Sequence, residues 1–324
     1  MFKTFVDLFC GIGGFRLGLQ ACGLRCVWSC DIDKMARRVY NDNYHEMPAG
    51  DIYEVRAEDI PSMDVICGGF PCQSFSKAGK VEGFKDPRGQ LIYEVLRIAE
   101  YHKPKLLLLE NVPNLKNINS GRALTEICAL FEKIGYNCQW FELNGSEYGV
   151  AQIRTRIYFV FIRNDIFEKV EISYNYLQEA MWQISSIADI LDPVAEIPRE
   201  CRVNQALFEL FPTRIADGFK HIPILCGLKR LANDGKRKIA YETSNGARVY
   251  SDRGTNPTLT SRNNFVYDRR IGEVRKYSAR ELLKLQGFPE DFIIPSLASA
   301  IKLVGNSVIP RMVELVFRMI VVKK

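Results

Sequence analysis

The sequence predicts an open α/β fold, a mostly parallel sheet with helices on both faces, and three observations support this prediction. Several segments with strand character are near-continuous apolar runs, as expected for strands that are buried on both faces. Amphipathic segments with helical periodicity separate these runs. A glycine-rich turn follows the first run and opens the first helical segment. Folds of this class bind ligands at the carboxyl ends of their strands, so functional residues are expected there.

The predicted elements alternate along the first half of the chain. Strands are expected in the apolar runs at residues 3–9, 25–31, 63–69, 105–112, 136–143 and 156–163. Helices are expected in the amphipathic segments at residues 33–44, 89–103 and 121–135. Such an alternation indicates crossover connections between parallel strands.

The pattern changes after Asp165. From about residue 184 to 276 the chain is rich in turn residues, with short strand-like pieces and eight Lys or Arg against three acidic residues between Cys226 and Asn263. This basic stretch is equally well interpreted as a solvated surface or as a phosphate-contacting module. Helical periodicity returns at residues 278–289, where Ser278 and Glu281 have the spacing of a capping box. We therefore expect a first domain at 1–183, a smaller, irregular, β-rich domain at 184–283, and a return segment at 284–324 that completes the first domain.

Composition limits the class of protein. The chain has 324 residues, 47% of them hydrophobic, and a net charge of +6, which allows a polyanionic partner without requiring one. Asp7 interrupts the first apolar run, which argues against a signal peptide. No apolar run approaches the roughly 20 residues that span a bilayer. We expect a soluble, intracellular protein without membrane contact.

Ten cysteines are expected to be mostly buried thiols in a reducing compartment. Cys22, Cys26 and Cys30 are evenly spaced, but the spacing fits neither the CxxC pairs of zinc sites nor the motif of radical iron–sulfur enzymes. Cys26 and Cys30 share one face of a predicted strand. No metal site is predicted.

Glycines and carboxylates follow the first strands of the predicted sheet. Gly11, Gly13 and Gly14 allow a tight turn and the close approach of a ligand to the backbone. Asp31 ends the second strand, where a carboxylate can accept hydrogen bonds from ribose hydroxyls. Asp51, which we expect near the end of a further short strand, can accept a hydrogen bond from an exocyclic amine. Because the spacing is G-x-G-G rather than G-x-G-x-x-G, these residues fit a nucleoside cofactor without phosphates, such as S-adenosylmethionine.

A second group of residues points to nucleophilic chemistry on a ring. Cys72 follows a buried strand directly after a proline, and Glu110 ends another strand. Arg154 and Arg156 are two residues apart, so both guanidinium groups are expected on one side of an extended segment. None of the three histidines has the context of a partner for a thiol protease. A thiolate, a glutamic acid and a methyl donor suggest conjugate addition to a heteroaromatic ring, as carbon 5 of cytosine requires before it can be methylated.

Five motifs together closely resemble those of the bacterial cytosine-5 DNA methyltransferases. They are DLFCGIGG, GGFPCQSFS, ENV, QIRTR and the late GNS, in the order and at the spacing of that family. They cover the first ~165 and the last ~50 residues. The resemblance implies the Rossmann-like fold of the S-adenosylmethionine-dependent methyltransferases, with residues 184–283 as the target recognition domain. It also implies methyl transfer to carbon 5 of cytosine within a specific duplex sequence, by base flipping and a covalent adduct.

The resemblance assigns roles to single residues. Cys72 adds to carbon 6, Glu110 holds and protonates ring nitrogen 3, Arg156 binds the cytosine carbonyl oxygen, and Arg154 steadies the nucleophile loop and a nearby phosphate. The residues expected at the cofactor are Phe9, Gly11, Gly13, Gly14, Asp31, Ile32, Asp51, Ile52, Pro71, Leu91 and Asn306. Asp31 is one methylene shorter than the glutamate common in the family.

DNA contacts are expected in two places. Residues 73–90 resemble a lid that closes over DNA, and the later contacts lie in the recognition domain, where the TLT motif resembles a backbone anchor. The expected residues are Gln73, Ser76, Lys77 and Arg88, and then Arg248, Arg253, Thr258 and Thr260. The partner is double-stranded DNA. We further expect a monomer in the bacterial cytoplasm, associated with the nucleoid through DNA, and the modification half of a restriction-modification system, whose endonuclease shares the site without forming a stable complex.

Three alternatives stay open at this point. The same cysteine, glutamate and arginine signatures occur in enzymes that methylate transfer RNA, although a variable domain of ~100 residues favours duplex DNA. A non-catalytic DNA-binding module is disfavoured because every chemical position is intact. A thiol redox protein using Cys67 and Cys72 is disfavoured because the CxxxxC spacing differs from the CxxC redox motif.

Overall fold

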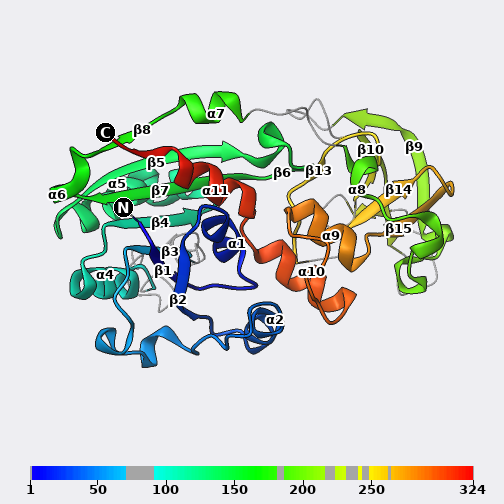
Figure 1. Ribbon diagram of the computed structural model, residues 1–324. Coiled ribbons are helices and arrows are strands. Elements are labelled where there is room, and N and C mark those ends of the chain that lie inside the picture. The colour runs from blue at the N-terminus through cyan, green and yellow to red at the C-terminus, as the bar shows by residue number, and fades with distance from the viewer. Residues whose placement is uncertain are drawn as a thin grey trace. The chain divides into compact units, whose positions relative to one another are not determined.

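The computed structural model describes residues 2–70, 91–180, 186–215, 223–230, 240–242, 248–261 and 264–323 (Figure 1). The chain divides into two compact units. The large unit comprises Met1–Asn144, Thr155–Ala180 and Val308–Lys324, and the small unit comprises Gly145–Arg154 and Met181–Ser307. Relative to the predicted boundaries, residues 145–154 and 284–307 thus group with the small unit.

A six-stranded sheet forms the centre of the large unit. Its strand order is β2-β1-β3-β4-β7-β5, and β7 alone runs against the other five. The six predicted strands are all present, as β1 (Thr4–Leu8), β2 (Arg25–Cys30), β3 (Val65–Gly69), β4 (Leu106–Asn111), β5 (Tyr136–Asn144) and β7 (Thr155–Arg163). The mostly parallel sheet is therefore confirmed. A two-stranded sheet pairs β8 (Val170–Ile172) with β16 (Ile320–Val322).

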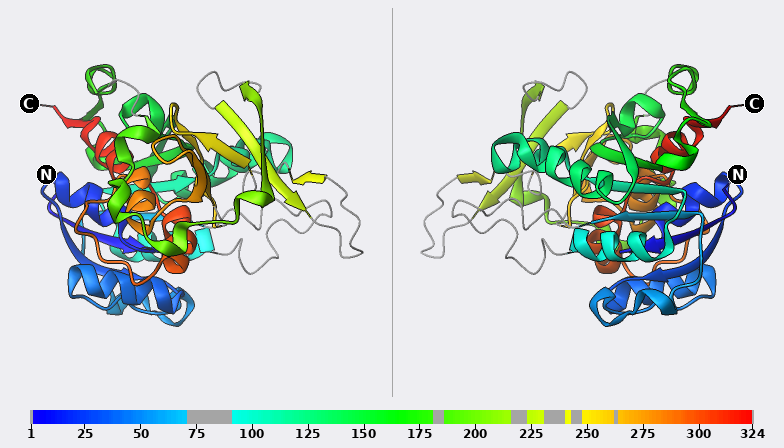
Figure 2. Two further views of the ribbon diagram at one scale, coloured as in Figure 1. Left: turned by 90° about the vertical axis from the view of Figure 1, so that its right-hand side faces the viewer. Right: turned by 90° about the vertical axis from the view of Figure 1, so that its left-hand side faces the viewer.

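Both faces of the central sheet are buried, which explains its continuous apolar runs. The four leucines of β4, residues 106–109, are fully buried although alternate side chains point to opposite faces. On one face, Leu107 and Leu109 belong to a core that includes side chains from two predicted helices, α4 (Leu91–His102) and α5 (Arg122–Glu132). Figure 2 shows α5 and α11 (Pro310–Arg318) on opposite faces of this sheet.

Close packing joins the first and last helices of the large unit. In α1 (Gly14–Ala21), a Cβ at Gly18 would lie 2.6 Å from the carbonyl oxygen of Pro310, the first residue of α11. Glycine at this position thus lets the two helices touch through backbone. The part of the large unit that the structure describes also contains α2 (Lys34–Tyr44), α6 (Asn164–Phe167) and α7 (Asn175–Glu179), with 3-10 turns η1 (Ile52–Glu54), η2 (Ala57–Asp59) and η3 (Pro113–Gly121).

The small unit contains a second six-stranded sheet, which is more regular than the irregular domain predicted for this region. The strand order is β11-β10-β12-β14-β15, and β9 also pairs with β10. The strands are β9 (Phe208–Ile215), β10 (Pro223–Arg230), β11 (Ala240–Glu242), β12 (Arg248–Ser251), β14 (Phe265–Asp268) and β15 (Glu273–Lys276). A separate pair joins β6 (Gln152–Ile153) to β13 (Asn256–Pro257).

Helices α8 (Ile187–Ile190), α9 (Ala279–Gln286) and α10 (Leu297–Asn306) complete the small unit, with 3-10 turns η4 (Gly145–Tyr148), η5 (Val194–Glu196), η6 (Arg199–Cys201) and η7 (Gln205–Leu207). The capping box predicted for Ser278 and Glu281 is confirmed: each side chain accepts a hydrogen bond from the backbone N–H of the other.

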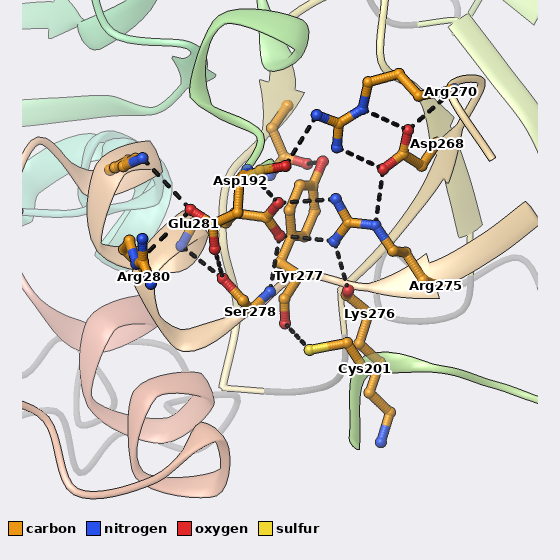
Figure 3. Close-up of polar contacts among 12 residues, drawn as sticks. Asp192, Cys201, Asp268, Arg270, Arg275, Lys276, Tyr277, Ser278, Arg280 and Glu281 are labelled. Atoms are coloured by element: carbon orange, nitrogen blue, oxygen red, sulfur yellow. Dashed lines mark hydrogen bonds and ion pairs between the residues drawn. The ribbon is translucent and has the colours of Figure 1, made fainter. Parts of the chain in front are cut away.

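A buried ionic network, shown in Figure 3, holds β14 and β15 to the start of α9. The Arg275 guanidinium is 1% exposed and lies between two fully buried carboxylates, at 3.0 Å from Asp268 and 2.7 Å from Glu281. Arg270 adds a second ion pair to Asp268 at 2.7 Å. Burial alone would raise the pKa of Asp268, but the hydrogen bonds from Arg270 and Arg275 outweigh it and lower that pKa.

Two features of the large unit differ from expectation. Asp51 does not end a strand; it starts η1, where its carboxylate accepts a hydrogen bond from the Tyr53 N–H at 3.1 Å. The short polar AGD stretch favours such a capped turn over an additional strand. Cys128 of α5 and Cys138 of β5 form a disulfide. The free thiols are Cys10, Cys22, Cys26, Cys30, Cys67 and Cys201 among the residues whose side chains are described.

Within the described ranges, no helix is both long and apolar enough to cross a bilayer.

Candidate active site

Strand register brings the predicted functional residues to one edge of the large unit's sheet. In the parallel pairs, Leu8 lies opposite Cys30 and Gly68, and Gly69 lies opposite Glu110. The loops that follow β1, β2, β3 and β4 therefore start side by side. Carboxyl ends of neighbouring parallel strands are the usual ligand site of such folds.

Glu110 and Arg156 form an ion pair at this edge. Glu110 on β4 and Arg156 on the antiparallel β7 approach to 2.8 Å between Oε1 and Nε, and their side chains are 14% and 12% exposed. Nη1 of Arg156 also donates to the Thr155 carbonyl at 2.7 Å, which fixes the guanidinium plane. A carboxyl group and a guanidinium that are held together and still accessible can bind a planar group carrying both a donor and acceptors.

The chain leaving β3 is held next to this pair. The Asn111 side-chain amide donates to the Phe70 carbonyl at 3.1 Å. Gly69 leaves space at the carboxylate, since a Cβ there would lie 3.1 Å from Oε2 of Glu110. Cys72 follows two residues after Phe70 and lies outside the described residues, as do Pro71, Gln73, Ser76, Lys77 and Arg88.

The glycine turn after β1 has a backbone that few side chains adopt. Phe9, Gly11 and Gly13 have φ values of 57°, 54° and 89°. The N–H of Gly11 donates to the Asp31 carboxylate at 2.8 Å, which joins the turn to the end of β2. Gly13 precedes α1, whose N-terminus has no side-chain cap. Backbone N–H groups at a helix start that lack intrahelical partners attract electron-rich ligand atoms.

Residues after β2 complete a surface suited to a nucleoside. Asp31 accepts a second hydrogen bond, from the Asp33 N–H at 2.8 Å, and burial raises the pKa of its carboxyl group. The next side chain, Ile32, is 71% exposed and offers an apolar face against which a planar ligand can pack. Ile52 is buried, and Leu91 is the first residue of α4.

A buried carboxylate lies beneath the turn. Asp7 of β1 is fully buried, and burial raises its pKa to about 8. The Cys67 thiol, also fully buried, donates to Asp7 at 3.7 Å and to the Val6 carbonyl at 3.3 Å. Burial raises the pKa of Cys67 well above the usual range. A thiol that is neither accessible nor readily ionised is unsuited to redox exchange, which disfavours the redox alternative further.

The two arginines of QIRTR contact residues of different units. The pair was predicted to point to one side, yet Arg154 precedes β7 and binds backbone carbonyls of the small unit, at 2.7 Å from Ser307 and 3.2 Å from Gly305. It is 4% exposed. Arg156, by contrast, turns to Glu110 in the large unit. Arg154 therefore binds the backbone of the late GNS motif. Asn306 of this motif is exposed at the end of α10.

Sequence reasoning missed Gln152, which connects three segments of the small unit. Its side-chain amide donates to the Leu285 carbonyl and to Gln286, each at 2.9 Å, and accepts from the Leu259 N–H at 2.8 Å. Gln286 in turn donates to the Ser307 carbonyl at 2.6 Å. Gln152 is the first residue of the QIRTR motif, and this was the sequence feature that could have indicated its role. A fully buried glutamine must find hydrogen-bond partners for its amide.

The residues expected to contact DNA in the small unit are only partly described. The Thr258 hydroxyl donates to the Ile153 carbonyl at 2.8 Å, so it contributes to the fold of the unit. Thr260 packs against Gly305, where a Cβ would lie 2.8 Å from the Thr260 carbonyl. Arg253 is exposed, and Arg248 starts β12. Their DNA contacts stay predictions.

Comparison with known proteins gives a consistent result. The model of the family described as C-5 cytosine-specific DNA methylase matches residues 3–322. The chain is 34% identical over 319 residues to the Type II methyltransferase M.HhaI of Haemophilus parahaemolyticus, covering 94% of this chain and 90% of that protein. It is 35% identical over 330 residues to the Type II methyltransferase M.HpaII of Haemophilus parainfluenzae, covering 94% and 85%.

The fold is shared with solved structures of low sequence identity. The Dnmt2 methyltransferase of S. pombe superposes with a TM-score of 0.70 at 18% identity, over 97% of each chain. Family model, relatives and fold agree along nearly the whole sequence. The chain belongs to the C-5 cytosine-specific DNA methylase family.

Proposed function

We propose that this enzyme transfers a methyl group from S-adenosylmethionine to carbon 5 of a cytosine within a specific duplex DNA sequence, by base flipping and a covalent Cys72 adduct. The observation that carries the proposal is the accessible Glu110–Arg156 pair beside the strand that leads to Cys72. The description of the matching family, C-5 cytosine-specific DNA methylase, supports DNA as the substrate over transfer RNA.

The pair fits the polar edge of cytosine. A flipped base can place its ring nitrogen 3 and amino group at the Glu110 carboxyl group and its carbonyl oxygen at Arg156. Glu110 then holds a proton at ring nitrogen 3 while the Cys72 thiolate adds to carbon 6. This addition shifts electron density of the ring to carbon 5, which becomes nucleophilic. Arg156 stabilises the charge that develops on the carbonyl oxygen.

The later steps regenerate the aromatic ring. With the donor bound, carbon 5 would take the methyl group as the methyl–sulfur bond of the donor breaks and its electron pair stays on that sulfur. Carbon 5 would then lose its proton to a base. The bond between carbon 6 and the Cys72 sulfur breaks, and its electron pair returns to the thiolate. A water molecule in the site is suitable as the base that takes the proton.

The residues after β1 and β2 fit the methyl donor. Gly11 has open space where a side chain would lie, and the exposed Ile32 offers an apolar face to an adenine ring. The Asp31 carboxylate, which already holds the Gly11 N–H, is placed for ribose hydroxyls. Phe9, Gly13, Gly14, Asp51, Ile52, Pro71, Leu91 and Asn306 complete the proposed cofactor residues. When bound, the donor supplies an electrophilic methyl group.

Substrate access and selection are assigned to two regions. Flipping a base costs about a few kcal/mol, which contacts to the displaced strand must offset. We assign that work to residues 73–90 and the readout of sequence to the small unit, including Arg248 and Arg253. We also propose a monomer in the bacterial cytoplasm that is associated with the nucleoid through DNA. A restriction endonuclease would act separately on the same site.

Expression in a methylation-deficient host tests the proposal. Bisulfite conversion followed by sequencing of the host DNA should reveal unconverted cytosines within one short sequence, and a Glu110→Gln variant should leave them converted. Full conversion with the wild-type enzyme, together with methyl transfer to transfer RNA in vitro, would contradict the choice of DNA.

A further inference from the structure

The glycine turn of the proposed cofactor site is attached to its surroundings at both ends. At one end, Asp31 accepts the Gly11 N–H at 2.8 Å. At the other, the Tyr44 hydroxyl donates to the Gly13 carbonyl at 3.1 Å. Both anchors flank α2, because Asp31 precedes this helix and Tyr44 is its last residue. The segment 31–44, which ends with α2, therefore holds the turn at both ends.

Tyr44 is itself held in place by an arginine. The Arg16 guanidinium, 6% exposed on α1, lies 4.4 Å from the centre of the Tyr44 ring and 5.3 Å from that of Tyr40. Its Nη1 contacts Glu46 at 2.6 Å and the Tyr40 hydroxyl at 3.3 Å. A planar cation stacked on an aromatic ring and tied to a carboxylate has little freedom to move.

The backbone conformation of the turn requires supporting contacts. Its left-handed residues include Phe9, and a non-glycine residue in this region costs about 1–3 kcal/mol, which surrounding contacts must offset. Loss of these contacts would therefore favour other conformations of the turn. The apparent affinity of a ligand falls with the fraction of protein in the competent conformation. Contact between ring and glycine is also tight, since a Cβ at Gly13 would lie 2.4 Å from the Tyr44 ring.

We propose that Tyr44, supported by Arg16, is a positioning residue that holds the glycine turn in the conformation that binds the methyl donor. This inference rests on the proposed cofactor. It assigns the residues no contact with DNA and no part in the chemistry. Burial raises the pKa of the Tyr44 hydroxyl, so it keeps the proton that it donates under assay conditions.

Tyr44→Phe removes the hydroxyl and keeps the ring. Calorimetric titration with S-adenosylmethionine should show a Kd about fivefold higher, the effect of one hydrogen bond on an equilibrium constant. Turnover at saturating donor should stay within twofold of wild type. Hydrogen exchange of a peptide covering residues 9–17 should be faster in the donor-free variant. Tyr40→Phe is the matched control, because that hydroxyl contacts Arg16 and Cys26 but not the turn, and its Kd should stay within twofold.

Arg16→Lys tests whether the arginine acts through the tyrosine. It should also raise the Kd, and the double variant with Tyr44→Phe should lose less than the product of the two single losses. An unchanged Kd in Tyr44→Phe, or equal losses in Tyr44→Phe and Tyr40→Phe, would overturn the inference. A wild-type enzyme that does not bind S-adenosylmethionine would instead refute the proposed cofactor.

Discussion

The two units of the molecule are stabilised by different kinds of interior. The large unit buries continuous apolar strands on both faces, such as the leucines at 106–109. In the small unit, an apolar cluster of the buried residues Val249, Phe265 and Val274 accompanies the buried Arg275 network. Apolar contacts are non-directional, whereas ion pairs and amide hydrogen bonds fix geometry. We propose that the large unit, with its apolar interior, carries the chemistry. The small unit, with its ionic network, recognises the DNA sequence.

The largest expected effect concerns the chemistry assigned to the large unit. Cys72→Ser should lower methyl transfer at least about a thousandfold, because a hydroxyl ionises far less readily than a thiol at neutral pH. Donor affinity should stay within about twofold, since the thiol acts on the base. Radiolabelled methyl transfer and calorimetry measure the two quantities. Turnover above a tenth of wild type would remove Cys72 from its assigned role.

The ionic network of the small unit is expected to show the next largest effect. Arg275→Met leaves two buried carboxylates without their shared cation and should lower the free energy of unfolding by about 3–5 kcal/mol. Denaturant unfolding measures this loss. Arg280→Met is the control, because that side chain is 48% exposed and its close ion pair, at 2.9 Å, is with the half-exposed Glu196, whereas the buried Asp192 carboxylate lies 3.8 Å away. We expect a change below about 1 kcal/mol. Equal effects of the two substitutions would show that burial of the network contributes nothing.

Recognition by the small unit should give a smaller and more selective effect. Arg253→Ala, at an exposed position, should weaken binding to the target sequence by about 1–3 kcal/mol and leave random DNA unchanged if the guanidinium reads a base. If it contacts phosphate, both DNAs should weaken equally and the salt slope should fall by about one. The same comparison applies to Arg248→Ala. Loss of donor binding measured without DNA would contradict the separation of roles between the units.

A buried carboxyl group in the large unit gives a pH-dependent prediction. The pKa of Asp7 is about 8 in the folded protein against 3.8 in the unfolded chain, so the folded state binds the additional proton and stability is lost as pH rises between these values. Asp7→Asn removes this dependence. The difference in free energy of unfolding, Asp7→Asn minus wild type, should rise by about 1.4 kcal/mol per pH unit from pH 5. This difference should level off near pH 8. Parallel stability curves for the two proteins would show that Asp7 is already ionised.

The sequence was informative where a local pattern determines structure. The apolar runs predicted the six strands of the large unit, and the Ser278–Glu281 spacing predicted a capping box that is present. The partner of Glu281 was not predictable in this way, because Arg275 reaches it across the junction of β15 and α9.

The residues of the candidate site also differ in how far the sequence could predict them. Glu110 and Arg156 belong to motifs, but their ion pair depends on the register of β4 with β7, which no motif states. Arg154 was placed beside Arg156 by spacing alone, whereas the chain changes units between them. Tyr44 belongs to none of the five motifs, and its contact with Gly13 arises from the packing of α2. Short-range patterns thus predicted the six strands and the capping box, but not the different directions of Arg154 and Arg156, and contacts between distant segments required the structure.

Trapping of the covalent adduct tests the central claim most directly. DNA carrying 5-fluorocytosine at the target site cannot lose a proton from carbon 5, so the bond to sulfur should persist. With S-adenosylmethionine present, wild-type protein should form one complex that survives denaturing electrophoresis, and peptide mapping should locate the modified base on Cys72. Cys72→Ser should form none. A wild-type enzyme that methylates unmodified target DNA and yet yields no adduct, or an adduct on another residue, would contradict the account.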